Sequence, residues 1–223
     1  MSSLRRTARR LAALLTIAAP GLAAQAMPGH AHHAAPAADS VRALPPGVTP
    51  ADVAFVQGMI GHHAQALVMT ALLDTRTTRP AMRLLAERIR VSQRDELRMM
   101  RDWLLDRGLP APEADTLPHT PGHAAGAHHA DHAAMPGMLG AAQLDTLARA
   151  QGAAFDAHFL RYMIAHHEGA LVMVRRLFAT PGAGQEPQLF GFATDVDADQ
   201  RAEITRMRAL LAQVAGTPTR RRR

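Results

Sequence analysis

The sequence predicts an all-α fold, a four-helix bundle built from two repeated helical hairpins. Its composition favours helices, because 48% of the residues are hydrophobic but only 4% are aromatic, and the abundant alanine, leucine and methionine are good helix formers. Apolar residues recur at helical spacing in four stretches of the chain. Two of these stretches also resemble each other, GMIGHHAQALVM at residues 58–69 and YMIAHHEGALVM at residues 162–173. Two similar hairpins are the expected halves of a four-helix bundle.

Residues 1–26 predict a secretory signal peptide. They combine a basic start, a short apolar run at residues 11–19, a Pro-Gly break and the small residues Ala24 and Ala26, which is the order typical of such a leader. We expect cleavage near Ala26 and export to the periplasm, by the general or the twin-arginine route. Because no later stretch approaches the roughly 20 apolar residues of a membrane helix, the mature chain is expected to have no membrane span.

The first hairpin is predicted at residues 50–108. Before it, residues 27–49 are rich in His, Ala and Pro without periodicity, and they predict a disordered segment. Thr49 is suited to cap the first helix, Pro50 to its first position and Asp52 to its first turn. That helix is expected to run to about residue 73. A second helix is expected from Pro80 to the stop signal at Gly108.

The second hairpin is predicted at residues 141–216, after a His-rich linker of low complexity at residues 109–140. The linker histidines, with Met135 and Met138, either collect loosely held metal or belong to an alanine-rich spacer. Helical character resumes near residue 141 and continues to about 179, with Gly152 as an irregularity. The last helix is expected at about 188–214. Residues 217–223 form a basic tail outside the predicted domain, residues 50–216.

Charge and cysteine content exclude several classes of function. All 25 basic residues are Arg, and without the four at each end of the chain 17 remain against 19 acidic residues. The predicted domain therefore has no basic surface of the kind that nucleic acid requires. The chain has no Cys, so neither disulfides nor thiolate metal ligands are available. No nucleophile with a base, no phosphate loop and no Cys-based zinc pattern is present, and we predict that the protein is not an enzyme.

The repeated stretch carries the candidate metal ligands. At about 100° per residue, the methionines and histidines of each copy share one helix face with the apolar stripe that turns toward the bundle interior. Imidazole binds many transition metals, whereas thioether selects copper, above all Cu(I). The candidate ligands are His62, His63, His166, His167, Met59, Met163, Met69 and Met173. They predict copper, as Cu(I), Cu(II) or both, with zinc less favoured, and binding that weakens below a pH of about 6.5 because it needs neutral imidazole.

Other roles stay open for some residues. Methionine at helical spacing often only fills a core, and both interpretations stand for Met69 and Met173. Asp52 and Asp156 are expected to cap helices or to orient a ligand. Four polar residues of the second helix in each hairpin, Gln93, Glu96, Gln200 and Glu203, are predicted to be ordinary exposed side chains, with a ligand-orienting role as the lesser alternative.

Several stretches resemble the family called domain of unknown function 305. They are FVQGMIGHHAQALVM, FLRYMIAHHEGALVM, the linker's MPGML and the Q..E[LI]..M spacing of the second helices. The resemblance spans about residues 50–215 and implies a ferritin-like helical bundle of exported bacterial proteins, some of which bind copper and support copper tolerance. It implies copper binding by Met59, His62, His63, Met163, His166 and His167. Val68 and Val172 stand where many members carry an acid, which argues against a carboxylate-supported site.

The leading hypothesis is a periplasmic copper-binding protein that sequesters the ion, or passes it to another periplasmic copper-handling protein, and contributes to copper tolerance. A ferritin-like metal oxidase is one alternative, although such sites use inward glutamates and a Glu-x-x-His spacing that neither repeat has. A structural or partner-binding bundle without metal is the other. Whether the two histidine pairs form one site or two stays open at this stage.

Overall fold

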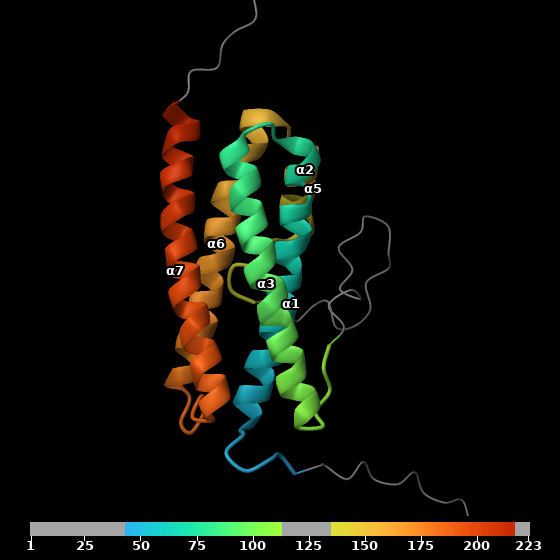
Figure 1. Ribbon diagram of the computed structural model, residues 1–223, viewed down its shortest axis with the longest axis vertical. Coiled ribbons are helices and arrows are strands. Elements are labelled where there is room, and N and C mark those ends of the chain that lie inside the picture. The colour runs from blue at the N-terminus through green and yellow to red at the C-terminus, as the bar shows by residue number, and fades with distance from the viewer. Residues whose placement is uncertain (1–42, 113–134, 217–223) are drawn as a thin grey trace, which may run out of the picture. The chain divides into compact units, whose positions relative to one another are not determined.

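The protein is an all-helical bundle, as predicted. The computed structural model describes residues 43–112 and 135–216. Its long helices are α1 (Pro50–Ala71), α3 (Pro80–Asp106), α6 (Gly152–Ala179) and α7 (Pro187–Gly216), and its short ones are α2 (Leu73–Arg76) and α5 (Ala141–Arg149) (Figure 1). The predicted signal peptide, most of the two His-rich segments and the basic tail lie outside the described residues. None of the described helices is long and apolar enough to cross a membrane.

The start of α1 follows the predicted cap. The Thr49 hydroxyl accepts a hydrogen bond from the Asp52 amide (3.2 Å), and the Asp52 carboxylate accepts one from the Thr49 amide (2.8 Å). A capping role for Asp156 is wrong, because α6 begins at Gly152 and Asp156 already lies inside the helix; a ligand-orienting role stays a prediction. The Asp156 carboxylate instead pairs with Arg79, 3.3 Å away.

A break divides the stretch at 141–179, which the sequence predicted as one helix with an irregularity. Ala150 and Gln151 are extended, and Gly152 has a φ of +56°, a conformation that glycine adopts without steric cost. The chain changes direction there, and α6 starts as a separate helix. Gly152 is therefore the site of the irregularity that the sequence predicted.

The apolar core consists of two clusters, one on each side of the histidine pairs. The Met59 cluster includes Phe55, Met59, Trp103, Met173 and Phe192. The Met163 cluster includes Met69, Leu73, Phe155, Phe159 and Met163. Each cluster thus combines the early methionine of one repeat with the late methionine of the other. Since α1 also packs against α6, this exchange means that the two repeated helices run antiparallel and cross at their histidines.

Candidate metal centre

The two histidine pairs meet in the middle of the bundle. All four imidazoles are buried, with at most 1% of each residue exposed. The rings of His62 and His166 are in contact, with centroids 3.8 Å apart and planes tilted by 38°. The His63 ring lies 6.5 Å from that of His62, and the His167 ring 6.2 Å from that of His166. The result is a row of imidazoles in which His62 and His166 form the centre.

A carboxylate is hydrogen-bonded to each of the outer histidines, His63 and His167. Nε2 of His63 is hydrogen-bonded to Oε2 of Glu96 on α3, and Nε2 of His167 to Oε2 of Glu203 on α7, 2.5 Å away. Nδ1 of both rings is buried without a hydrogen-bond partner. A carboxylate on one ring nitrogen fixes the orientation of the imidazole and leaves the lone pair on the other, as in many metal-binding histidines.

The structure corrects the prediction that the polar residues of α3 and α7 are exposed. Glu96 and Glu203 are only 9% and 6% exposed, and Gln93 and Gln200 are buried as well. Their spacing already carried this information, because Gln93 and Glu96 share a helix face with the buried Leu97 and Met100. Val68 and Val172 do not leave the histidines without carboxylates, because Glu96 and Glu203 reach them from other helices.

Burial keeps the central imidazoles neutral. Desolvation, followed by repulsion from the neighbouring histidines, lowers the pKa of His62 to about 3 and that of His166 well below its ordinary value. Burial alone would raise the pKa of Glu96, but the hydrogen bond and charge of His63 outweigh it and lower the pKa overall. Near neutral pH the imidazoles of His62 and His166 are therefore uncharged, and the carboxylate of Glu96 is ionised.

Only one of the four imidazoles is not held by a hydrogen bond. Nε2 of His62 donates to the carbonyl oxygen of Pro136 (3.1 Å), and Nε2 of each outer histidine pairs with its carboxylate. Neither ring nitrogen of His166 has a hydrogen-bond partner, although both are buried. An imidazole in this state has lost its hydration without compensation.

The four methionines flank the imidazoles. Met59, Met69 and Met163 are fully buried, and Met173 is 9% exposed. Met59 and Met173 lie in one apolar cluster and Met69 and Met163 in the other. Each side of the imidazole row therefore has one thioether from α1 and one from α6.

A segment at the end of the linker, residues 135–140, lies across α1 and α6, and we call it the strap. The Gln65 amide binds it on α1, accepting a hydrogen bond from Leu139 N (2.8 Å) and donating one to Leu139 O (3.0 Å). On α6 the contact is between backbones, because a Cβ added to Gly169 would lie 2.0 Å from the Pro136 oxygen. The sequence predicted only a linker here, since this packing is not a local property of the chain.

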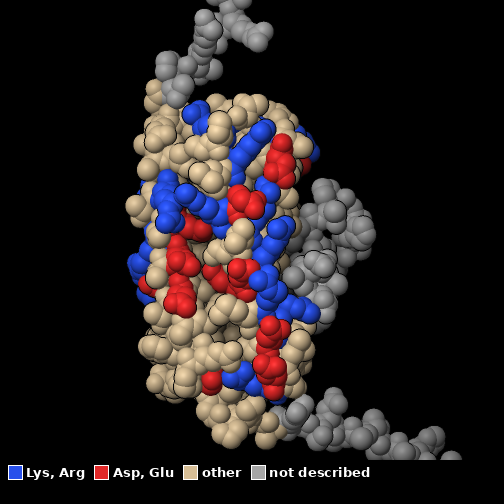
Figure 2. Space-filling model, viewed as in Figure 1, with Lys and Arg blue, Asp and Glu red and all other residues tan. Residues whose placement is uncertain are grey.

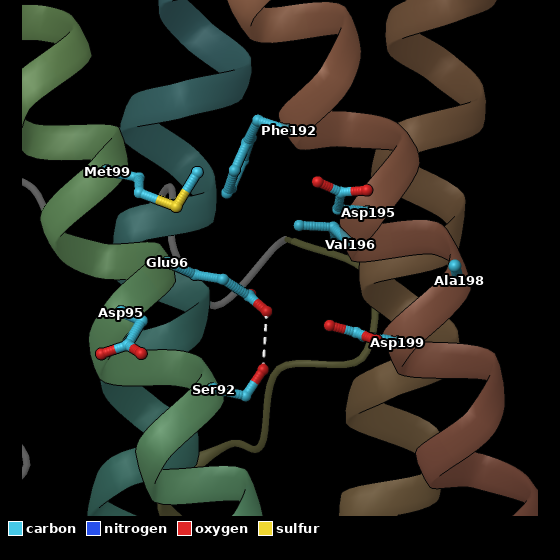
Figure 3. Close-up of a pocket in the computed structure, with 9 residues that line it drawn as sticks. All are labelled: Ser92, Asp95, Glu96, Met99, Phe192, Asp195, Val196, Ala198 and Asp199. Atoms are coloured by element: carbon cyan, nitrogen blue, oxygen red, sulfur yellow. Dashed lines mark hydrogen bonds between the residues drawn. The ribbon is translucent and has the colours of Figure 1, made fainter.

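An acidic pocket opens between α3 and α7, with a volume of about 340 Å³. Figure 3 shows Glu96 and Asp199 pointing into it from opposite helices. The Ser92 hydroxyl donates a hydrogen bond to the Glu96 carboxylate (2.8 Å). Burial, and the charges of Glu96 and Glu203, raise the pKa of Asp199. Around the pocket, acidic and Arg side chains are interspersed on the visible face (Figure 2). Glu96 therefore links buried His63 to a solvent-facing acidic surface.

The donor atoms do not form a ready-made site for a hard metal ion. Within residues 43–112 and 135–216, no group of three or more His, Asp or Glu side chains is arranged to hold a metal. The two imidazoles that lie closest together are those of His62 and His166, and the methionines of α1 and α6 lie on either side of them along the helices. Such a set suits a soft ion that accepts few ligands better than Mg²⁺ or Ca²⁺.

The sequence profile of the domain of unknown function DUF305 matches residues 52–211. The chain belongs to the DUF305 family. A DUF305 fragment from Deinococcus radiodurans has a similar structure, with 34% identity and a TM-score of 0.62, covering 76% of this chain and 99% of that one. A candidate secreted DUF305 protein from Streptomyces coelicolor is 27% identical, with a TM-score of 0.59 and coverage of 78% and 98%. No curated protein matches the chain.

This DUF305 protein is also similar in structure to CopM. The Cu(I)-bound form of CopM is 27% identical, with a TM-score of 0.53, and the match covers 74% of this chain and 98% of CopM. CopM has also been solved with Cu(II), with silver and in the apo form.

Proposed function

We propose that this DUF305 protein is an exported copper-binding protein that takes up Cu(I) at the His62 and His166 pair and sequesters it or passes it on. The observation that carries the proposal is the buried contact between these two rings, one of which has no hydrogen bond to either nitrogen. Such an arrangement costs free energy in a protein that only needs a core. A bound metal ion would use the unpaired nitrogens.

The surrounding residues support a soft cation. His63 and His167 would offer Nδ1 while Glu96 and Glu203 hold their Nε2 atoms. Met59, Met163, Met69 and Met173 would supply thioethers, which favour copper, whereas zinc would use the imidazoles alone. The ionised Glu96 offsets positive charge brought into the interior. Because protons do not compete for His62 near neutral pH, binding there requires no proton release.

The relatives support the choice of metal and the compartment. CopM, at 25–27% identity, has been solved with Cu(I), Cu(II) and silver. We infer export from the signal peptide pattern at residues 1–26, and the S. coelicolor relative is itself described as a candidate secreted protein. The proposal places a bundle domain at residues 50–216 in the periplasm, where it contributes to copper tolerance and transfers copper to another periplasmic copper-handling protein.

The test is a competition titration of the mature chain with Cu(I) under anaerobic conditions and with Cu(II) in air. We expect Cu(I) binding with a Kd below about 1 μM, lost in a variant with both His62→Ala and His166→Ala. His158→Ala is the matched control, because that histidine is on α6 but outside the imidazole row. Circular dichroism establishes that the variants fold. Unchanged Cu(I) affinity in the double variant would refute the proposal.

A metal oxidase is the second candidate, and one observation favours it more than the sequence did. Glu96 and Glu203 point inward beside histidines, as glutamates do in di-iron bundles. The spacing on α3 and α7 is nevertheless Gln-x-x-Glu, without the Glu-x-x-His of those sites. Iron or manganese in the purified protein, together with oxygen consumption on reduction, would favour this candidate over copper binding.

A further inference from the structure

A groove of about 370 Å³ opens on the surface where α1, α6 and the strap meet. Its position is defined by Gly58 of α1, Met173 of α6 and Met135 of the strap. Apolar residues make up most of the remaining lining, which comprises Ala51, Ala54, Phe55, Pro136, Arg176, Leu177 and Thr180. The groove lies beside the Met59 cluster, against which Met135 also packs.

Two thioether side chains converge in this groove because Gly58 has none. A Cβ on Gly58 would lie 3.3 Å from Sδ of Met135 and 3.4 Å from Cε of Met173. The two methionines therefore approach the same point, one from the strap and one from α6. Met135 is partly buried and Met173 is 9% exposed, so both are close to solvent.

A third thioether continues inward from the groove. Met59 follows Gly58 directly in α1, is fully buried and belongs to the same cluster as Met173. His62 comes three residues later, which places it about one helical turn further into the bundle. Methionines thus lead from the surface to the central imidazoles.

The charge of the groove favours a soft ion over a hard one. No acidic residue is among its described lining residues, and its one charged side chain is Arg176. A hard divalent cation would find no carboxylate there and would be repelled by the guanidinium. Thioether sulfur binds Cu(I) and Ag(I) without needing a negative charge.

The surface that corresponds to this groove when the two repeats are exchanged is closed. Tyr162 stands at the position of Gly58, and its ring stacks with that of His158 at 5.7 Å. Met69, the counterpart of Met173, is fully buried, and Leu139 of the strap packs into the same cluster. An ion that reached this end would meet aromatic and aliphatic side chains.

We propose that Met135 and Met173 form a surface site for Cu(I), through which the ion passes by Met59 to the histidine pair. The inference rests on the proposed function in that it takes His62 and His166 as the destination of the copper. It makes Met135 of the strap a copper ligand. It also predicts that copper enters the bundle from this end only.

The test compares uptake rates with equilibrium affinity in the mature protein. Anaerobic stopped-flow transfer of Cu(I) from a coloured chelator is measured for a variant with both Met135→Leu and Met173→Leu, which keeps side-chain volume but removes sulfur. We expect uptake to slow by about tenfold, and by a larger factor than Kd rises, because Met173 also belongs to the proposed ligand set. Gly58→Leu should slow uptake as well, because it fills the groove without removing a thioether. Met82→Leu is the matched control, because this buried methionine lies in the Met163 cluster at the closed end and is not a proposed ligand; it should leave the rate unchanged.

Two results would overturn the proposal. One is an unchanged rate in the Met135 and Met173 variant, and the other is an equal slowing by Met82→Leu. A separate measurement distinguishes failure of this site from failure of the histidine site. In the His62→Ala, His166→Ala protein with 13C-methyl-labelled methionine, Ag(I) should shift the methyl signals of Met135 and Met173. Absence of these shifts refutes the surface site, whatever the fate of the histidine site.

Discussion

The two repeats of the bundle share their donor atoms but differ in the residues around them. Met59, His62 and His63 correspond to Met163, His166 and His167 at an offset of 104 residues, and both pairs are buried side by side. At the same offset Gly58 corresponds to Tyr162 and Gln65 to Gly169. The shared residues make up the candidate metal centre. The differing residues determine which end of it is open and where the strap is held.

The comparison is sharpest at the central histidines. The strap carbonyl at Pro136 holds His62, whereas no hydrogen bond holds His166. Both pKa values are nevertheless lowered by the same cause, burial. The two central histidines therefore have pKa values shifted in the same direction but differ in their hydrogen bonding, and variants can separate the two properties.

The largest expected effect is a loss of stability in acid for the metal-free protein. Folding lowers the pKa of His62 from 6.5 to about 3, so between these values the unfolded chain binds a proton that the folded protein does not. Stability is full above pH 6.5 and falls by about 1.4 kcal/mol per pH unit for each such histidine as the pH drops. His166 should contribute in the same direction.

Urea denaturation between pH 7.5 and 4.5 measures this dependence. His62→Leu and His166→Leu should each remove one titrating group and reduce the slope by a similar amount, if the repeats are electrostatically equivalent. The carboxylates of Glu96 and Glu203 and the outer histidines face the same region, and all are retained in both variants. A slope that only one variant reduces would break the equivalence.

The next effect concerns the two attachments of the strap. Gly169→Ala should destabilise the protein by roughly 2–3 kcal/mol, because the new methyl group would occupy the place of the Pro136 backbone. Gln65→Ala should cost about 1–2 kcal/mol, because it leaves two buried backbone groups of Leu139 unpaired. Chemical denaturation measures both.

Gly191→Ala is the control for the glycine substitution, since nothing lies within 4 Å of a Cβ at that position. It should be neutral or stabilising by up to about 1 kcal/mol through helix propensity. Equal stability of the Gly169 and Gly191 variants would show that the strap does not pack on α6 in solution.

The smallest effect is expected where the repeats match best. Glu96→Gln and Glu203→Gln should each weaken Cu(I) binding by roughly tenfold, because a neutral amide holds the outer histidine less firmly and offsets no charge. Asp95→Asn is the control, as that residue is an exposed neighbour of Glu96 on α3. Competition titration should give similar losses for both variants, and a loss in only one would assign the metal to one half of the row.

Local sequence information was enough for the bundle and for the inward direction of the histidines, because helical periodicity depends only on neighbouring residues. It was not enough for Glu96 and Glu203, whose importance depends on which residue lies across from them on another helix. Their helical spacing indicated burial, but acidic side chains are usually exposed, and the sequence was therefore interpreted as placing them at the surface. The position of the strap could not be predicted from the sequence for a different reason. It depends on the absence of a side chain at Gly169, about 30 residues further along the chain.

The position of the strap has a consequence for how such a protein could arise. Gln65 and Gly169 are the same position in the two repeats, and one segment contacts both, so the strap lies across the approximate twofold axis that relates the hairpins. In a symmetric dimer of identical hairpins, two copies of such a segment would compete for one place. Joining the repeats into one chain leaves a single copy to occupy it. Gene fusion would in this way have turned a symmetric dimer with two equivalent ends into a single chain with two different ends.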